Sequence, residues 1–328
     1  MELRELGSTG IDVSVLGFGC WQLGGKGWGT FSLRDVIVAL QEAHAAGVNL
    51  FDTAPVYGLG RSEELLGRTV ASYDDCVIVS KGGLAWDEAG RIHHDARPES
   101  LRHQLKQSLQ RLRRERVDVY LLHWPDPKVP LAESTGALEG FLNEGLIRFW
   151  GLSGHSLSVI QPLLAAESLS VLELPVNLLD AYSDEFTQLA PEIPSLLSAA
   201  KRSTAAVLAF DVLARGFLPR PTTSDPEVFG RRDLRRNDWR FGQRGLAELD
   251  EQRRRLHELA RQQALPPSAL AIRAASERSG VTSSLVGIKT PTQLRENLRF
   301  LEAEHALDPE PRGNLGFDQY DAEINPDQ

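Results

Sequence analysis

VNLFDTAPVY, residues 48–57, begins as a short run of mainly apolar residues and ends in side chains that have no place in a hydrophobic core. The same arrangement recurs twice further along the chain, in CVIVSK (76–81) and in VDVYLLHW (117–124). Short runs rich in Val, Ile and Leu predict strands that are buried on both faces. Because segments with helical periodicity separate these strands, we expect a parallel sheet covered by helices.

Further strands and helices extend this alternation along the chain. A hairpin is predicted first, from LREL through the turn GSTG to IDVSV, residues 3–15. Two helices are predicted most clearly. One begins at Pro98, and the other runs from about Leu131 to Glu144. Alternation by itself leaves a closed (β/α)8 barrel and an open doubly wound sheet both possible. The other predicted strands are LGFGCW (16–21), IRFWGLS (147–153), VLELPVN (171–177), AAVLAFDVL (205–213) and VTSSLVGI (281–288).

Two segments interrupt the alternation. Residues 218–245 are rich in Arg, Pro and Asp, and we expect a long loop there. Four of its arginines, Arg231, Arg232, Arg235 and Arg236, either fold over a ligand or face solvent. The tail, residues 308–328, has prolines, glycines and acidic residues without periodicity, which predicts an irregular, partly disordered segment.

The bulk properties exclude several classes of protein. A formal net charge of −9 argues against a nucleic-acid partner. No run of apolar residues approaches the ~18 that a membrane helix needs. The charged residues Glu2, Arg4 and Glu5 exclude an ordinary signal peptide. Cys20 and Cys76 have no metal ligands at short spacing. We therefore expect a cytoplasmic protein without a metal site.

The polar strand ends predict a site for proton and hydride chemistry. In a barrel, loops at the carboxyl ends of the strands build the active site, and Asp52, Lys81 and His123 stand at three such ends. Tyr57 follows Asp52 by five positions. A tyrosine pKa near 10 needs a neighbouring cation to favour the phenolate, which Lys81 can supply while paired with Asp52. His123 can hydrogen-bond a substrate oxygen.

Each of these residues also has a structural interpretation. Asp52 can cap a loop, Tyr57 can be a rim aromatic, Lys81 a solvated charge and His123 a buried histidine with satisfied hydrogen bonds. Their coincidence at the ends of consecutive strands is what favours catalysis.

Three motifs, in order along the chain, resemble the aldo-keto reductase superfamily from about Leu3 to Leu301. GVNLFDTAPVYGLGRSEELLG is similar to the first signature of that family, VDVYLLHWPDP to its histidine strand, and VTSSLVGIKTPTQLRENLRFL to the segment that binds the adenosine half of the cofactor. The resemblance implies one (β/α)8 TIM barrel over residues 1–307, followed by the tail. It also implies a catalytic tetrad of Asp52, Tyr57, Lys81 and His123, with Tyr57 as general acid/base.

The resemblance further implies NADP(H) as the cofactor, bound without a Rossmann fold; GLGRSEELLG lacks the G-x-G-x-x-G spacing. Lys289 and Thr290 suit a 2′-phosphate at a helix start, a solvated lysine being the alternative. Gln293 and Asn297 match positions that contact the adenine moiety. The other positions implied to contact the cofactor are Ser153, Gly154, Glu173, Phe210, Asp211, Leu213 and Gly287.

The predicted nicotinamide pocket departs from the family pattern at several of these positions. Gly154 replaces the usual Asn, with His155 beside it, and Phe210-Asp211 replaces Tyr-Ser. Glu173 stands where Gln is common, and a carboxylate cannot donate to the carboxamide carbonyl. We hypothesise that an ionised Glu173 favours the oxidised cofactor. The alternative is that Glu173 is rotated away or protonated by burial.

The resemblance implies a small carbonyl or alcohol substrate, or a sugar-like intermediate. Trp21, Trp86 and Trp124 either wall the substrate pocket or pack at the barrel rim, and Trp28 lies in the same loop as Trp21. Two other functions stay open: a Schiff-base aldolase using Lys81, and a non-catalytic, redox-responsive partner protein. The sequence does not indicate an oligomeric state.

Overall fold

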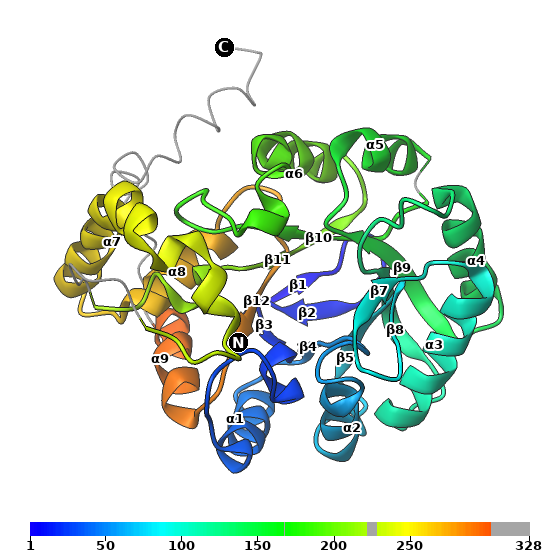
Figure 1. Ribbon diagram of the computed structural model, residues 1–328, viewed down its shortest axis with the longest axis horizontal. Helices are drawn as coiled ribbons and strands as arrows, with labels where there is room; N and C mark the ends of the chain where they lie inside the picture. The colour runs from blue at the N-terminus through cyan, green and yellow to red at the C-terminus, as the bar shows by residue number, and fades with distance from the viewer. Residues whose placement is uncertain (167, 222–227, 303–328) are drawn as a thin grey trace.

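The computed structural model describes residues 1–166, 168–221 and 228–302, so the predicted tail lies outside the described residues. Eight parallel strands close into a barrel in the order β3–β4–β5–β8–β9–β10–β11–β12 (Figure 1). This closure confirms the barrel and excludes the open doubly wound sheet. The strands are β3 (Leu16–Gly19), β4 (Leu50–Asp52), β5 (Val77–Gly82), β8 (Val117–Leu122), β9 (Ile147–Ser153), β10 (Val171–Pro175), β11 (Ala206–Phe210) and β12 (Ser283–Gly287).

Helices lie around the outside of this ring (Figure 1). Local sequence signals set several of their ends: the Ser32 hydroxyl accepts from the Asp35 backbone N–H at the start of α1, and Pro98 opens α3. No helix within the described ranges is long and apolar enough to cross a membrane. The helices are α1 (Leu33–Ala45), α2 (Arg61–Arg68), α3 (Pro98–Leu112), α4 (Leu131–Asn143), α5 (Leu157–Ala165), α6 (Ile193–Lys201), α7 (Gln243–Gln262), α8 (Pro267–Ser276) and α9 (Pro291–Glu302).

Two antiparallel hairpins accompany the barrel. The predicted N-terminal hairpin pairs β1 (Leu3–Glu5) with β2 (Asp12–Ser14), and Leu6, Ile11 and Val13 of this segment belong to the same apolar cluster as the barrel interior. A second hairpin, which the sequence did not predict, pairs β6 (Leu84–Trp86) with β7 (Ile92–His94) directly after β5. It therefore rises beside the carboxyl end of the barrel.

Alternation along the strands explains where the polar side chains come from. Successive side chains of a strand point to opposite faces, so residues two apart share a face. The interior cluster contains Leu50, Val79, Leu121, Val171 and Leu208 from five of the strands. The residues that follow these five by two positions are, in the same order, Asp52, Lys81, His123, Glu173 and Phe210. These five residues therefore form the next inward-facing layer, at the carboxyl end.

The segment predicted as a long loop, residues 218–245, contains short helical turns in its described part from residue 228 onward. Short 3-10 turns occupy Leu234–Asn237 and Trp239–Phe241, and α7 already begins at Gln243. The Leu234 N–H donates 2.9 Å to the carbonyl of Gly27, in the loop after β3. Gly27 has φ +83°, a left-handed conformation that favours glycine, and a Cβ there would stand 2.7 Å from the Leu234 side chain.

Candidate active site

A cavity of about 810 Å³ opens at the carboxyl end of the barrel. Its lining includes Asp52, Tyr57 and His123 at one end and Lys289, Gln293 and Asn297 at the other. A second hollow, of about 880 Å³, lies against α7 and α8 between Arg254 and Pro267, and its lining contains none of the polar strand ends. We therefore place the candidate site in the first cavity, although the second is no smaller.

Lys81 is the centre of a charged cluster beside this cavity; it is not in the lining itself, but its partners Asp52 and Glu173 are. Its side chain is completely buried, its ammonium pairs with Asp52, and it donates 3.2 Å to the Thr53 carbonyl. The Glu173 Oε2 atom lies 3.3 Å from the same ammonium. Burial alone would lower the pKa of Lys81, but Asp52 and Glu173 outweigh it and raise that pKa. Lys81 is thus held as a cation.

Tyr57 stands beside this cluster with its ring centroid 5.4 Å from the Lys81 ammonium. Burial raises the pKa of the Tyr57 hydroxyl, and Asp52 and Glu173 raise it further, while Lys81 lowers it. The sequence led us to expect that the cation would dominate, but the surroundings contain two anions as well. The hydroxyl therefore stays protonated at neutral pH, as a proton donor requires.

His123 completes the predicted tetrad. Its ring lies edge-on to Tyr57, with centroids 5.9 Å apart and planes at 81°. Burial and the Lys81 charge hold the pKa of His123 well below its usual value. The imidazole is consequently neutral and can hydrogen-bond an oxygen without carrying charge into the site. The structure brings all four predicted catalytic residues together.

The positions predicted to contact a nicotinamide lie on three adjacent strands. Glu173 on β10 pairs in register with Ser153 on β9 and Leu208 on β11, and Ser153, Glu173 and Phe210 line the cavity. Gly154 has φ +68° and is not in the lining; a Cβ there would point toward Phe186 and Trp124. His155 is also outside the lining. Its Nδ1 lies 2.8 Å from the Ser153 carbonyl.

A buried ion-pair network fixes the loop that follows β11. Asp211 and Leu213 line the cavity as predicted, and the Asp211 carboxylate accepts 2.6 Å from Arg240. Arg240 is fully buried and also pairs with Asp238, which accepts 3.3 Å from Arg215. Asp211 and Arg215 both have positive φ, an unfavourable conformation for these residues unless the surroundings enforce it.

Cations gather at the far end of the cavity. Lys289, Arg220 and Arg235 line it there, together with Gln293 and Asn297. Burial, and then Arg235 and Arg220, lower the pKa of Lys289 to about 8, against the opposing effect of Asp233. Of the four arginines singled out in the sequence, only Arg235 is part of the lining.

Two predicted residues at this end have other roles or neighbours. Thr290 is not in the lining; its hydroxyl accepts from the Gln293 backbone N–H and caps α9. Gly287 is in the lining, and a Cβ there would stand 1.8 Å from the Gln22 amide nitrogen. Gln22 and Trp28 also line this region, and the Gln22 Oε1 and Trp28 Nε1 atoms are buried without a hydrogen-bond partner among the described residues.

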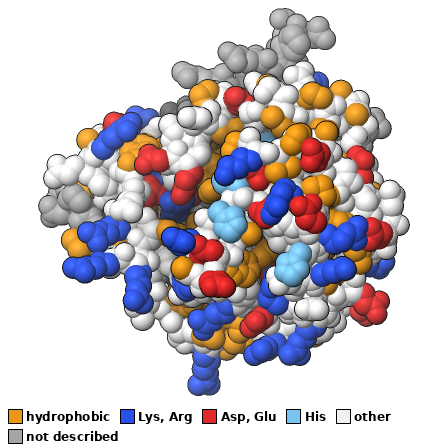
Figure 2. All heavy atoms as spheres, turned by 45° about the vertical axis from the view of Figure 1, so that its right-hand side comes forward, with side chains coloured by type: hydrophobic (Ala, Val, Ile, Leu, Met, Phe, Trp, Pro, Cys, Tyr) orange, Lys and Arg blue, Asp and Glu red, His pale blue; other side chains and the backbone are white. Residues whose placement is uncertain are grey.

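Aromatic and charged side chains surround the mouth near Tyr57. Trp21 stacks on the Tyr57 ring at 5.6 Å and 20°, and Trp124 lies edge-on to His123. Trp86 does not line the cavity; Leu84, Ile92, His93 and His94 of the same hairpin do. Sequence reasoning missed these residues because β6 and β7 are too short to show a period of two. Figure 2 shows charged side chains of both signs interspersed with apolar surface over one face of the molecule.

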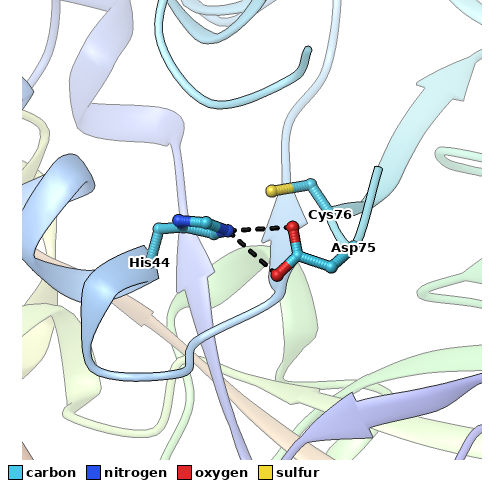
Figure 3. A group of neighbouring side chains, drawn as sticks. All are labelled: His44, Asp75 and Cys76. Atoms are coloured by element: carbon cyan, nitrogen blue, oxygen red, sulfur yellow. Dashed lines mark hydrogen bonds and ion pairs between the residues drawn. The ribbon is translucent and has the colours of Figure 1, made fainter. Parts of the chain in front are cut away.

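One potential metal-ligating group exists among the described residues, at the other end of the barrel. His44, Asp75 and Cys76 bring their ligand atoms within 4.8 Å of one another, and Figure 3 shows the His44 ring directed at the Asp75 carboxylate. The His44 Nε2 lies 3.0 Å from Asp75 Oδ1. Burial raises the pKa of Cys76 to about 12, so its thiol is protonated at neutral pH. This group joins α1 to the start of β5, far from the polar strand ends.

Comparison with known proteins gives a consistent result. The family model described as the Aldo/keto reductase family matches residues 15–310. Aldo-keto reductase YhdN of Bacillus subtilis (strain 168) is 30% identical over 298 residues, covering 90% of this chain and 87% of that protein. The NADH-specific methylglyoxal reductase of Escherichia coli (strain K12) is 29% identical over 318 residues, covering 92% of this chain and 94% of that protein.

A solved structure supports the same relationship. The glycerol dehydrogenase AKR11B4 from Gluconobacter oxydans superposes with a TM-score of 0.83 at 28% identity, over 99% of this chain and 97% of that one. The barrel, the polar layer at its carboxyl end and these matches agree. The chain belongs to the aldo/keto reductase family of oxidoreductases.

Proposed function

We propose that the protein is an NADP(H)-dependent oxidoreductase that interconverts a small carbonyl compound and its alcohol, with Tyr57 as general acid/base. The observation that carries this proposal is a protonated tyrosine and a neutral histidine lining one cavity, with a buried lysine cation directly behind the tyrosine ring. These groups are what carbonyl reduction requires beside a hydride donor.

The residues of the site act as follows. The bound cofactor supplies or accepts the hydride at the carbon atom. In reduction, Tyr57 passes its hydroxyl proton to the carbonyl oxygen, and the Lys81 ammonium stabilises the phenolate that remains. Asp52 and Glu173 keep Lys81 protonated, and His123 donates a hydrogen bond that orients the same oxygen. In oxidation the Tyr57 phenolate takes the proton back.

The residues present fit a dinucleotide that carries a 2′-phosphate. The cavity extends from Tyr57 to Gln293, and Gln22 and Trp28 are part of its lining. Lys289 supplies the charge that a phosphate favours, and Arg235 lies beside it as a cation paired with Asp233 at 2.7 Å. One relative is named NADH-specific, so the cation cluster, rather than family membership, supports our choice of NADP(H).

The mouth of the cavity supports a small polar substrate. Trp21, Trp124 and Phe186 offer apolar ring faces, whereas His93, His94 and the Arg215–Glu185 pair offer hydrogen bonds. Relatives are named for methylglyoxal and glycerol, which are small oxygenated molecules. We therefore place the substrate among small aldehydes, ketones, polyols and sugars. Activity in the cytoplasm stays a prediction from the sequence.

Neither alternative function has an observation in its favour. A Schiff-base aldolase needs an uncharged lysine nucleophile, whereas Asp52 and Glu173 hold Lys81 as a buried cation. A redox-responsive partner protein would need no general acid, yet all four residues of the predicted tetrad are present and lie together.

Titration with NADPH and NADH, followed by tryptophan fluorescence, tests this proposal because Trp21 and Trp28 line the cavity. We expect micromolar or tighter binding of NADPH and weaker binding of NADH. Binding of NADPH without turnover of any small carbonyl would favour the partner-protein function instead. Binding of neither would contradict the assignment of the cavity.

A further inference from the structure

Glu173 brings a second carboxylate to the catalytic lysine. Its Oε2 atom lies 3.3 Å from the Lys81 ammonium, which also pairs with Asp52. All three side chains are buried, with at most 6% of any of them exposed. The cluster therefore carries one net negative charge when both carboxylates are ionised, and none when one of them is protonated.

Glu173 is the member of this cluster whose charge changes near neutral pH. Burial raises its pKa to about 7, with Asp52 adding to the shift and Lys81 and Ser153 opposing it. Burial also raises the pKa of Asp52, but Asp52 makes the closer contact with Lys81, which opposes this shift by stabilising the carboxylate. Tyr57 also interacts electrostatically with Glu173, and its hydroxyl stays protonated.

The position of this carboxylate determines what its charge can act on. Glu173 lines the cavity between Ser153 and the Phe210 end of β11, at the end where Tyr57 and His123 stand. Hydride transfer has to occur beside those two residues. The nicotinamide ring is a cation in the oxidised cofactor and neutral in the reduced one, so a nearby anion stabilises only the oxidised form.

We propose that Glu173 makes the site discriminate between the redox states of its cofactor, and that this preference for the oxidised form grows as the pH rises through neutrality. The inference rests on the proposed function and deepens it. Linkage requires the reciprocal effect: oxidised cofactor promotes ionisation of Glu173, and reduced cofactor does not.

The test is a pair of binding curves measured between pH 6 and 8.5, giving the dissociation constants of NADP⁺ and NADPH for the wild type and Glu173→Gln. In the wild type we expect the ratio of the NADPH constant to the NADP⁺ constant to rise about tenfold over this range. In Glu173→Gln the ratio should be independent of pH and lower at pH 8.5. Titration of the 2′-phosphate and of Lys289 cancels in the ratio, because both cofactors share the adenosine half.

Glu296→Gln is the matched control, since it removes a carboxylate from the lining of the same cavity near Asn297. It should change both constants by the same factor and leave the pH dependence of their ratio intact. If the ratio of the two dissociation constants depends on pH in Glu173→Gln as it does in the wild type, the inference is overturned. A wild-type ratio that does not change with pH overturns it as well, even if the variant fails to fold. Failure of both cofactors to bind would instead refute the proposed function itself.

Discussion

The Lys289 ammonium donates a hydrogen bond of 2.8 Å to the backbone carbonyl of Trp28, and so connects the end of β12 to the loop after β3. The same ammonium lies 5.8 Å from the Trp28 ring and 5.9 Å from the Phe31 ring. Lys289 therefore sits between aromatic surfaces at the cation end of the cavity. The two rings exclude water from the Lys289 ammonium, and the proposed preference for NADP(H) depends on the charge of that ammonium.

Replacing Lys289 by methionine should weaken NADPH binding by about tenfold or more, because a hydrogen bond to a charged group contributes ~1.5–3 kcal/mol. NADH has no 2′-phosphate, and its affinity should change little. Isothermal titration with both cofactors measures the two effects. Equal weakening of both would show that Lys289 supports the fold of this region rather than the phosphate.

The preference for NADPH over NADH should also fall as the pH rises. The pKa of Lys289 is lowered to about 8, so the ammonium is present below that pH and is lost above it. Between pH 7 and 9 we expect a several-fold loss of preference in the wild type. Lys289→Arg keeps its positive charge over this range, so its preference for NADPH over NADH should not change with pH. A wild-type curve as flat as that of the arginine variant would contradict the assigned role.

Lys81→Met should have two separable effects. Removing the cation leaves the Tyr57 phenolate without stabilisation, which should lower kcat by about 10²-fold or more. It also leaves Asp52 and Glu173 buried without their partner, and breaking such a pair destabilises a protein by ~3–5 kcal/mol. Urea unfolding and steady-state kinetics measure the two separately. Asp52→Asn should lower kcat less than Lys81→Met, because Glu173 still keeps Lys81 protonated. An equal loss of kcat in the two variants would show that Glu173 does not share this role with Asp52.

Arg240→Met should destabilise the protein and disturb the site together. Arg240 is fully buried between Asp211 and Asp238, so its loss leaves two buried carboxylates and should lower the free energy of unfolding by ~3–5 kcal/mol. Arg254→Met is the control, because Arg254 is 60% exposed and its pair with Asp250 should contribute under ~1 kcal/mol. Similar unfolding midpoints for the two variants would disprove this account of the β11 loop.

Much of the site could be predicted because the barrel repeats one geometry. Alternation along each strand places Asp52, Lys81 and His123 in one inward-facing layer, and the sequence displays them as polar ends of apolar runs. Glu173 and Phe210 follow from the same rule, since Val171 and Leu208 precede them by two positions.

Other features could not be read from the sequence because they depend on contacts between distant segments. The Gly27–Leu234 contact joins two loops about 200 residues apart, and the sequence indicated only a long loop there. The net direction of the Tyr57 pKa shift depends on how burial, two carboxylates and one ammonium combine, which requires positions rather than spacing. Trp86 was predicted at the cavity, but its hairpin turns Leu84 and His94 toward it instead.

Tyr57→Phe tests the central claim most directly, because it removes one oxygen atom and retains the ring that stacks on Trp21. The measurement is kcat for NADPH-dependent reduction of a small aldehyde, with the NADPH dissociation constant determined on the same preparation. Tyr73→Phe, at an exposed ring remote from the cavity, is the control. We expect Tyr57→Phe to bind NADPH normally and to lose about 10²–10⁴-fold in kcat, the usual contribution of a positioned acid. Wild-type turnover in Tyr57→Phe would contradict the assignment of the general acid and the mechanism built on it.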